Sequence, residues 1–463
     1  MKKRLILLFI IFINVTAYSQ NAGDSLLNEM NKASDSKKSI ILNSLSKFYR
    51  TTDPEKSKSF AEKAFENAVK YNNVLESANA LKNIGTYYYF KSHYSEAKEK
   101  YQLALKVYRS INYNSGISAC LNNIANICKD QSNFKEALTM YFESLKYDQI
   151  LNDNEGIAVT YSNIGLVYHL QSDYIRAIDY YKKSMDLEIQ NKNNEGIGEC
   201  LINIGKVYED NESYTEAMNH YKKALSIFNE SKNTMRIGLC LNNIGWLLFV
   251  SKKYDESKKF ILESFNIRKS QDDKEGMATC LANLGKIEEA KGNSDNALEY
   301  FFQSILIELD LGNRLGVASS LTSKGIVLLK LGRATESIDF FLNSLEISWQ
   351  IQAPKEISDN YKYISEAYAS LNNFEKAYKF SRLYINLNDS LNMQNIRKVL
   401  NDSIGESISI RMLDEKIDTT IWKDETDSFS ENGIEYYASV PKALIFSSLI
   451  IVVMVLVRLK YRG

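Results

Sequence analysis

Large and small apolar residues alternate at helical spacing along most of this chain. From Gly85, the pattern continues with Tyr88, Ala97, Tyr101 and Ala104. Steps of three and four residues place such side chains on one face of a helix. The same offsets give Tyr168, Ala177, Tyr181 and Ser184 after Gly165, and Tyr208, Ala217, Tyr221 and Ala224 after Gly205. The pattern predicts pairs of amphipathic helices.

Turn-forming residues separate the two helices of a pair. They form short clusters at 91–93, 171–173, 291–293 and 331–333. Clusters of this kind end one helix and begin the next. The chain is therefore predicted to be all-α and built from helix-turn-helix units.

A short motif shows that the units repeat. The sequence Leu81-Lys82-Asn83-Ile84-Gly85 returns in close copies about every 40 residues. Its Asn-Ile-Gly core is kept at 163–165, 203–205 and 243–245, loosens at 123–125 and 283–285, and fades at 323–325. A fixed period of this size is typical of a repeat array. We expect the glycine to bring the two helices close together, since a Cβ there would hold them apart.

These residues resemble the tetratricopeptide repeat, whose helix-turn-helix unit carries Leu-Gly, Tyr, Ala, Phe/Tyr and Ala at the same offsets. The resemblance covers residues 36–396 and implies a right-handed α-solenoid of about nine units. The usual unit has about 34 residues and often a proline after its second helix. Here the unit is longer and lacks that proline, so we expect a longer second helix and a loop such as 152–156.

The N-terminal residues 1–19 have the three parts of a secretory signal peptide. Lys2-Lys3-Arg4 is followed by an apolar run from Leu5 to Val15 and by Ala17-Tyr18-Ser19. An uncleaved N-terminal anchor is the alternative. Residues 20–35, with Leu26, Leu27 and Met30 at helical spacing, are predicted to form a capping helix before the array.

The C-terminal stretch 441–459 is predicted to be a transmembrane helix. Its uncharged core, Ala443 to Val457, spans about 22 Å, and snorkelling of Lys442 and Arg458 compensates for the short length. Basic residues after the span place the tail 460–463 in the cytoplasm and the repeats outside it. These features predict a single-pass protein of a bacterial membrane with a periplasmic repeat domain. A buried terminal helix of the solenoid is the alternative.

Residues 397–440 are predicted to be an acidic spacer next to the membrane. The stretch 414–435 holds eight acidic residues against Lys416 and Lys423, without a helical apolar stripe. Such a composition does not favour a packed repeat.

The five cysteines bear on the export prediction. Cys120, Cys200, Cys240 and Cys280 share one repeat position, where other units carry small residues. Stacked helices lie about 8–10 Å apart, too far for a disulfide between adjacent copies. We therefore predict buried free thiols, which are unusual in an oxidising compartment and argue against export.

The sequence contains no recognisable catalytic motif. It lacks the phosphate-binding G-x-x-x-x-G-K-[ST] loop, H-E-x-x-H and C-x-x-C. His93, His169 and His220 occupy unrelated repeat positions and do not form a ligand set. A formal net charge of +0 argues against a nucleic-acid partner. We predict a protein that is not an enzyme and that holds no metal or cofactor.

One polar column recurs with the repeat. An amide side chain both donates and accepts hydrogen bonds, so a row of asparagines can bind the backbone of an extended peptide. The tetratricopeptide resemblance implies that first helices line a concave groove. The predicted peptide-binding residues are Asn83, Asn123, Asn163, Asn203, Asn243 and Asn283, with Asn43 in the same column. The alternative is that each amide bonds to the neighbouring helix and only orders the stack.

The residues that precede these asparagines differ from unit to unit. They are Lys82, Asn122, Ser162, Ile202, Asn242, Ala282 and Thr322. Variation beside a constant residue is expected of a selective groove, and equally of a neutral surface.

The layout of the chain resembles the exported sensor region of bacterial membrane-bound histidine kinases. Only residues 460–463 follow the predicted span, so the resemblance ends before any kinase. We expect a membrane-anchored scaffold that binds a peptide or protein and signals through a separate partner. Two alternatives stay open, namely a structural scaffold of an envelope complex and a truncated sensor kinase.

Overall fold

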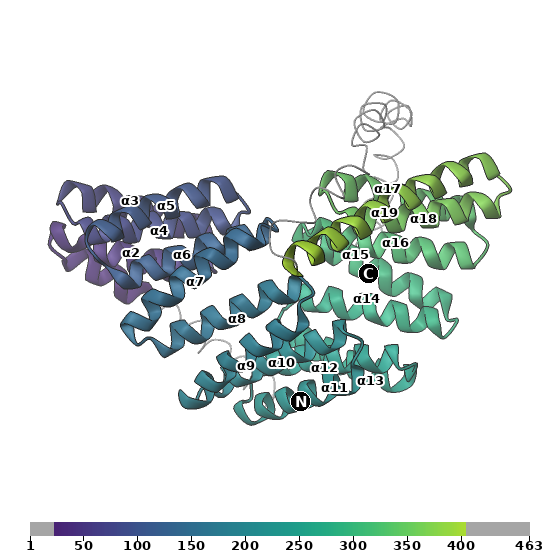
Figure 1. The fold of residues 1–463 in the computed structure, drawn as a ribbon, viewed down its shortest axis with the longest axis horizontal. Helices are drawn as coiled ribbons and strands as arrows, with labels where there is room; N and C mark the ends of the chain where they lie inside the picture. The colour runs from purple at the N-terminus through teal and green to yellow at the C-terminus, as the bar shows by residue number, and fades with distance from the viewer. Residues whose placement is uncertain (1–22, 404–463) are drawn as a thin grey trace, which may run out of the picture. The chain divides into compact units, whose positions relative to one another are not determined.

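The computed structural model describes residues 23–403, and every regular element in this range is helical (Figure 1). A helical stretch at 23–32 and the short 3-10 helix η1 (Asp35–Lys37) precede a series of paired α-helices. The all-α solenoid predicted from the repeat is thus confirmed. The predicted signal peptide at 1–19, span at 441–459 and tail at 460–463 lie outside the described residues. Between residues 23 and 403, none of the helices combines the length and the apolar character that a membrane crossing requires.

The helices alternate between first and second members of each pair. The first helices are α2 (Lys38–Tyr49), α4 (Val74–Phe90), α6 (Asn114–Asp130), α8 (Asn154–Leu170), α10 (Asn194–Asp210), α12 (Thr234–Val250), α14 (Lys274–Ala290), α16 (Arg314–Lys330) and α18 (Pro354–Ser370). The second helices are α3 (Pro54–Lys70), α5 (Tyr94–Ser110), α7 (Phe134–Leu151), α9 (Tyr174–Gln190), α11 (Tyr214–Ser231), α13 (Tyr254–Ser270), α15 (Ser294–Leu311), α17 (Ala334–Gln350) and α19 (Phe374–Ser403).

The described chain divides into two compact units between Leu331 and Gly332. The first unit contains α2 to α16 and every asparagine of the predicted column. The second contains α17, α18 and α19, which pack in sequence order. The predicted spacer was expected to begin at residue 397, but α19 continues through that position to Ser403.

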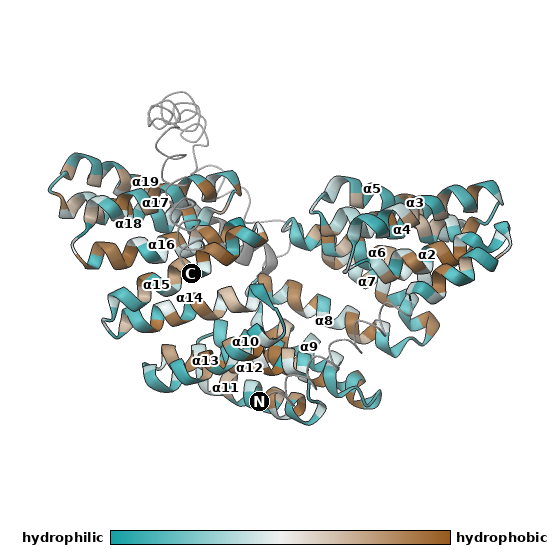
Figure 2. Cartoon of the chain, turned by 180° about the vertical axis from the view of Figure 1, so that it is seen from behind, coloured by the Kyte–Doolittle hydropathy of each residue, from teal (hydrophilic) through white to brown (hydrophobic). Residues whose placement is uncertain are grey.

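One turn geometry recurs every 20 residues from Asn72 to Asn372. The residue at each of these positions has a left-handed backbone, with φ between 51° and 80°. In the turn after α4, Ser92 has φ 58° and the His93 N–H donates to the Tyr88 carbonyl at 2.9 Å. This geometry closes the carbonyl end of a helix within a few residues. Hydrophilic residues gather at these turns in Figure 2.

The predicted loop at 152–156 is reduced to a two-residue turn, Asn152 and Asp153. Helix α8 already begins at Asn154, and the Asp153 carboxylate accepts a hydrogen bond from the Gly156 N–H at 2.9 Å. The sequence Asn-Asp-Asn-Glu-Gly resembles a loop, but its aspartate caps the helix and its glycine lies in the first turn. The extra length of the repeat is therefore shared by both helices, each of which has 17 residues in the α4–α5 pair.

The repeated glycine allows the close approach that the sequence predicted. A Cβ on Gly205 would lie 2.6 Å from Cε1 of Tyr221, and one on Gly85 would lie 2.8 Å from Cδ1 of Tyr101. Real Cβ atoms do not tolerate such distances. The aromatic ring of the second helix thus packs directly on the glycine of the first.

All five cysteines are buried and free, as predicted. Burial raises the pKa of Cys120 to about 12 and that of Cys200 to about 11. These thiols stay protonated at neutral pH, so they act as small packing groups rather than nucleophiles.

Candidate functional site

The first helices of residues 23–331 present one continuous row of partly exposed side chains. Helix α4 contacts both α2 and α6, and α14 contacts both α12 and α16. On α10 the exposed or half-buried positions along this row are Glu195, Glu199, Asn203, Lys206 and Asp210. Their spacing of three or four residues places them on one side of the helix. We call these positions and their equivalents on the other first helices the first-helix face.

The asparagine column lies along this face but is not uniform. Asn43 and Asn83 are buried, whereas the five from Asn123 to Asn283 are half-buried. Three asparagines, here called the bonded asparagines, donate to the preceding repeat. Asn83 donates to Oδ1 of Asn43 at 3.0 Å, Asn163 donates to Oδ1 of Asn122 at 2.9 Å, and Asn283 donates to Oδ1 of Asn242 at 3.1 Å.

The remaining three predicted residues are Asn123, Asn203 and Asn243, here called the open asparagines. Among the described residues, their side chains have no hydrogen-bond partner, and they reach solvent. For Asn163 and Asn283 the acceptor is the residue that precedes the column asparagine of the preceding repeat, which is Asn122 or Asn242. The equivalent residues for the open asparagines are Lys82, Ser162 and Ile202, and none of them accepts such a bond. Asn83 instead donates to the column residue Asn43.

Other polar contacts join neighbouring first helices at the junctions where no column asparagine is bonded. Tyr89 donates to Asp130 at 2.6 Å, and His169 lies 2.9 Å from Asp210. Further contacts pair Lys330 with Glu289 at 2.6 Å and Arg236 with Glu199. Although burial raises the pKa of Asp210, the hydrogen bond with His169 and the charge of Lys206 hold it below its ordinary value.

A buried polar network connects the bonded pair Asn163–Asn122 to a carboxyl group. Asn122 donates to Thr160 at 2.8 Å, and Thr160 donates to Asp148 Oδ2 at 3.1 Å. Ser118 donates to the other carboxylate oxygen of Asp148. Burial raises the pKa of Asp148, and these hydroxyl donors only partly oppose the effect. Hydrogen-bonded networks of this kind favour one arrangement of the helices that they join, here α6, α7 and α8.

Replacing Asp148 by asparagine should remove one source of pH dependence. A raised carboxyl pKa means that the folded chain binds a proton more tightly than the unfolded chain, so Asp148 contributes stability as the pH falls towards 3.8. We expect Asp148→Asn to be more stable than the wild type at pH 7, with a difference that shrinks on acidification. Urea unfolding between pH 7 and pH 4 measures this, with exposed Asp186→Asn as control. An unchanged pH dependence would contradict the prediction.

Two first helices, α8 and α12, each carry three apolar residues on the face, which the repeat motif did not predict. On α8 these are Val159, Leu166 and Leu170, and on α12 they are Leu239, Trp246 and Val250. Val159 and Leu170 are each 49% exposed. Both groups occupy the positions four residues before, three after and seven after the column asparagine. The apolar residues at these positions are visible in the sequence once the column is known.

Trp246 is the largest of these side chains. Its ring stacks on Phe249 at 5.2 Å between centroids, and the ammonium of Lys286 on α14 lies 5.1 Å from the ring centroid. The open amide of Asn243 lies one turn earlier on the same helix.

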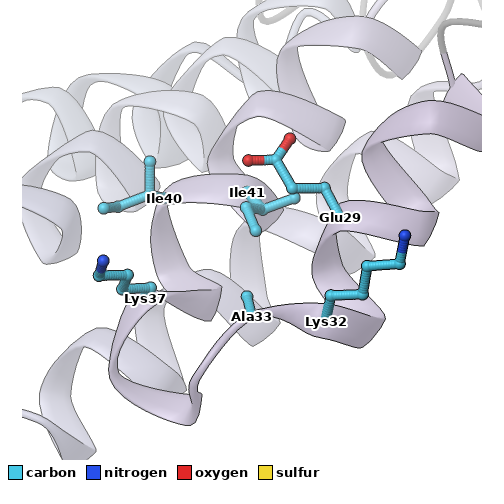
Figure 3. Close-up of a pocket in the computed structure, with 6 residues that line it drawn as sticks. All are labelled: Glu29, Lys32, Ala33, Lys37, Ile40 and Ile41. Carbon is cyan, nitrogen blue, oxygen red and sulfur yellow. The ribbon is translucent and has the colours of Figure 1, made fainter.

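A small pocket lies elsewhere, between the helical stretch at 23–32 and the start of α2 (Figure 3). Its volume is about 270 Å³, and its lining is Glu29, Lys32, Ala33, Lys37, Ile40 and Ile41. It contains none of the asparagines. In the described part of the chain, no group of three or more histidine, cysteine or acidic side chains is arranged to hold a metal ion.

Comparisons with known proteins agree with this architecture. The family model "Tetratricopeptide repeat" matches residues 117–189 and 156–230, and the model "Soluble NSF attachment protein, SNAP" matches residues 19–149. No curated protein matches the sequence.

Several solved structures share the fold at low sequence identity. A Rap protein complexed with competence and sporulation factor is 15% identical, with 78% of this chain and 99% of that chain covered and a TM-score of 0.54. The apo quorum sensor NprR from B. thuringiensis is 16% identical, with coverages of 81% and 99% and a TM-score of 0.54. The Rap conjugation gene regulator of plasmid pLS20 in complex with the Phr* peptide is 13% identical, with coverages of 74% and 96% and a TM-score of 0.52.

Proposed function

Because this chain carries tetratricopeptide repeats, we propose that it binds an extended peptide, or an extended segment of a partner protein, on the first-helix face of residues 23–331. The observation that carries the proposal is the set of open asparagines. Their amides are half-buried and have no hydrogen-bond partner among the described residues. Because these amides reach solvent, their donors and acceptors are accessible to an incoming peptide backbone.

The spacing of the open amides suits an extended chain. Asn203 and Asn243 lie on successive first helices, α10 and α12, which the Arg236–Glu199 ion pair joins, and neighbouring helices are about 8–10 Å apart. An extended chain advances about 3.4 Å per residue, so neighbouring amides fall about three residues apart along it. Each amide can donate to a peptide carbonyl and accept from a peptide N–H. This mode of binding reads the backbone and leaves specificity to the side chains around it.

The solved structures support the proposal by analogy of fold. Two of them are described as complexes, one with competence and sporulation factor and one with the Phr* peptide. Their identity to this chain is low, so the analogy does not identify a ligand. Another neighbour is described as an aspartyl phosphate phosphatase. We propose binding without catalysis here, since the face offers amides, apolar groups and paired charges.

Site-specific photo-crosslinking in cells tests the location of binding. A photoreactive residue in place of Lys206, which is exposed on the first-helix face, should form an adduct with a peptide or protein. The same residue in place of Lys222, exposed on the second helix α11, serves as the control. Adducts at 222 and none at 206 would overturn the proposal.

We further propose that the repeat domain lies outside the cytoplasm and signals through a separate membrane partner. The supports are the signal-like residues 1–19 and the apolar stretch 441–459 with basic residues after it. A cysteine added after Gly463 should then resist membrane-impermeant thiol reagents in intact spheroplasts and react after lysis. The native cysteines of the described chain are buried and should give little background. Labelling in intact spheroplasts would rule out this topology.

A further inference from the structure

The apolar and charged residues on the first-helix face are segregated by helix. On α8, Val159, Leu166 and Leu170 reach solvent or are half-buried, and on α12 the same holds for Leu239, Trp246 and Val250. The helix between them, α10, presents Glu199, Lys206 and Asp210 at the corresponding positions, with Glu195 one turn earlier. Two apolar surfaces therefore flank one charged surface.

The charges on α10 leave an excess of negative charge. Lys206 contacts Asp210 at 3.2 Å and also the buried Glu209 at 2.5 Å, so one lysine serves two carboxylates. His169 of α8 also lies 2.9 Å from Asp210. Arg236 of α12 pairs with Glu199. The exposed Glu195 receives a hydrogen bond from Asn233 at 2.9 Å, which is a neutral donor. A positively charged group placed over α10 would complement this surface.

We propose that the peptide bound by this face carries two large apolar side chains about five or six residues apart, with a lysine or arginine between them. This inference rests on the proposed function. The apolar side chains contact α8 and α12, and the basic residue lies over α10. The spacing follows because α8 and α12 are two helix steps apart, about 16–20 Å, and an extended peptide advances about 3.4 Å per residue.

Trp246 is the expected main anchor. Large aromatic residues in partly desolvated sites contribute most to peptide and protein binding. Its ring is held by Phe249 and Lys286, so little ordering is needed when a ligand arrives. The open amide of Asn243 on the same helix can fix the peptide backbone beside it.

Selection from a random nine-residue peptide library on the purified full-length chain in detergent tests the inference. Enriched peptides should share two large apolar residues five or six positions apart with a basic residue between. Enrichment of peptides with any other shared pattern would overturn this inference and leave the proposed function standing. A library that yields no enriched peptide would count against both.

The enriched peptide, labelled with a fluorophore, then serves as the probe for variants. Trp246→Ala should weaken its binding by about 30-fold, as for a central aromatic anchor. Trp349→Ala is the matched control, because Trp349 is 48% exposed on α17 in the second compact unit and should leave binding unchanged.

Two surface variants guard against a folding defect at Trp246. Val159→Ser and Leu170→Ser alter side chains that are half exposed to solvent on α8, so the fold should be kept. The double variant should bind the labelled peptide about tenfold more weakly. Unchanged binding in both the α8 double variant and Trp246→Ala would overturn the inference.

Discussion

Replacing Asn123, Asn203 and Asn243 together by alanine is expected to weaken peptide binding by about a hundredfold while the melting temperature stays near that of the wild type. A net hydrogen bond contributes about 1 kcal/mol, so three lost bonds correspond to about 3 kcal/mol, or about two orders of magnitude in affinity. These side chains make no hydrogen bond with the described residues, so the free protein loses little. Fluorescence anisotropy with a library-selected peptide measures the affinity, and circular dichroism measures the melting curve.

The bonded asparagines provide the matched control. Asn163→Ala leaves Oδ1 of Asn122 without its donor, and Asn283→Ala removes a donor from Oδ1 of Asn242. An unpaired buried polar group costs about 1–3 kcal/mol. The double variant should therefore melt earlier, with a smaller loss of affinity in the fraction that stays folded. If the open triple variant unfolds instead, or binds normally, the division into open and bonded asparagines has no functional meaning.

Alanine substitution at two helical glycines is expected to have opposite effects. At Gly205 the new Cβ would meet the Tyr221 ring at 2.6 Å, and the overpacking should cost about 1–3 kcal/mol. At Gly238 on α12, the nearest side-chain atoms lie 3.4 Å away, which is ordinary contact. Gly238→Ala should stabilise the chain by up to about 1 kcal/mol, since alanine favours the helix more than glycine. Urea unfolding followed by circular dichroism compares the two.

The comparison separates packing from helix propensity. Both glycines lie inside helices of 17 residues, so propensity alone predicts the same gain at both. A stabilised Gly205→Ala variant would show that the ring of Tyr221 can move aside. It would also show that close helix contact at this position is not required.

The helix pairs and their packing could be predicted from spacing alone. The offset from Gly85 to Tyr101 specifies which ring meets which glycine, because it recurs from Gly165 to Tyr181, from Gly205 to Tyr221 and from Gly285 to Phe301. At Gly245 the same position holds Ile261. The ends of helices were harder to predict. Asp153 resembles a loop residue until its side chain is seen to cap Gly156, and cap geometry depends on backbone angles that the composition does not reveal.

The candidate site could be predicted only in part. The asparagine column could be recognised in the sequence. Whether each amide is bonded or open depends on a residue about 40 positions earlier, on the preceding first helix. Asn163 is bonded because Asn122, on the preceding first helix, accepts its hydrogen bond. Asn243 is open because Ile202, which offers no acceptor, occupies the equivalent place. Trp246 was missed because a tryptophan at helical spacing is more often part of a core.

The polar contacts between first helices also bear on how the array responds to stress. Tyr89 with Asp130, Asn163 with Asn122 and His169 with Asp210 join neighbouring repeats only. Such a chain of nearest-neighbour couplings behaves like a one-dimensional lattice. Loss of one such contact is then expected to loosen the adjoining repeats and to leave distant repeats folded. The array can therefore open locally without unfolding of the whole domain.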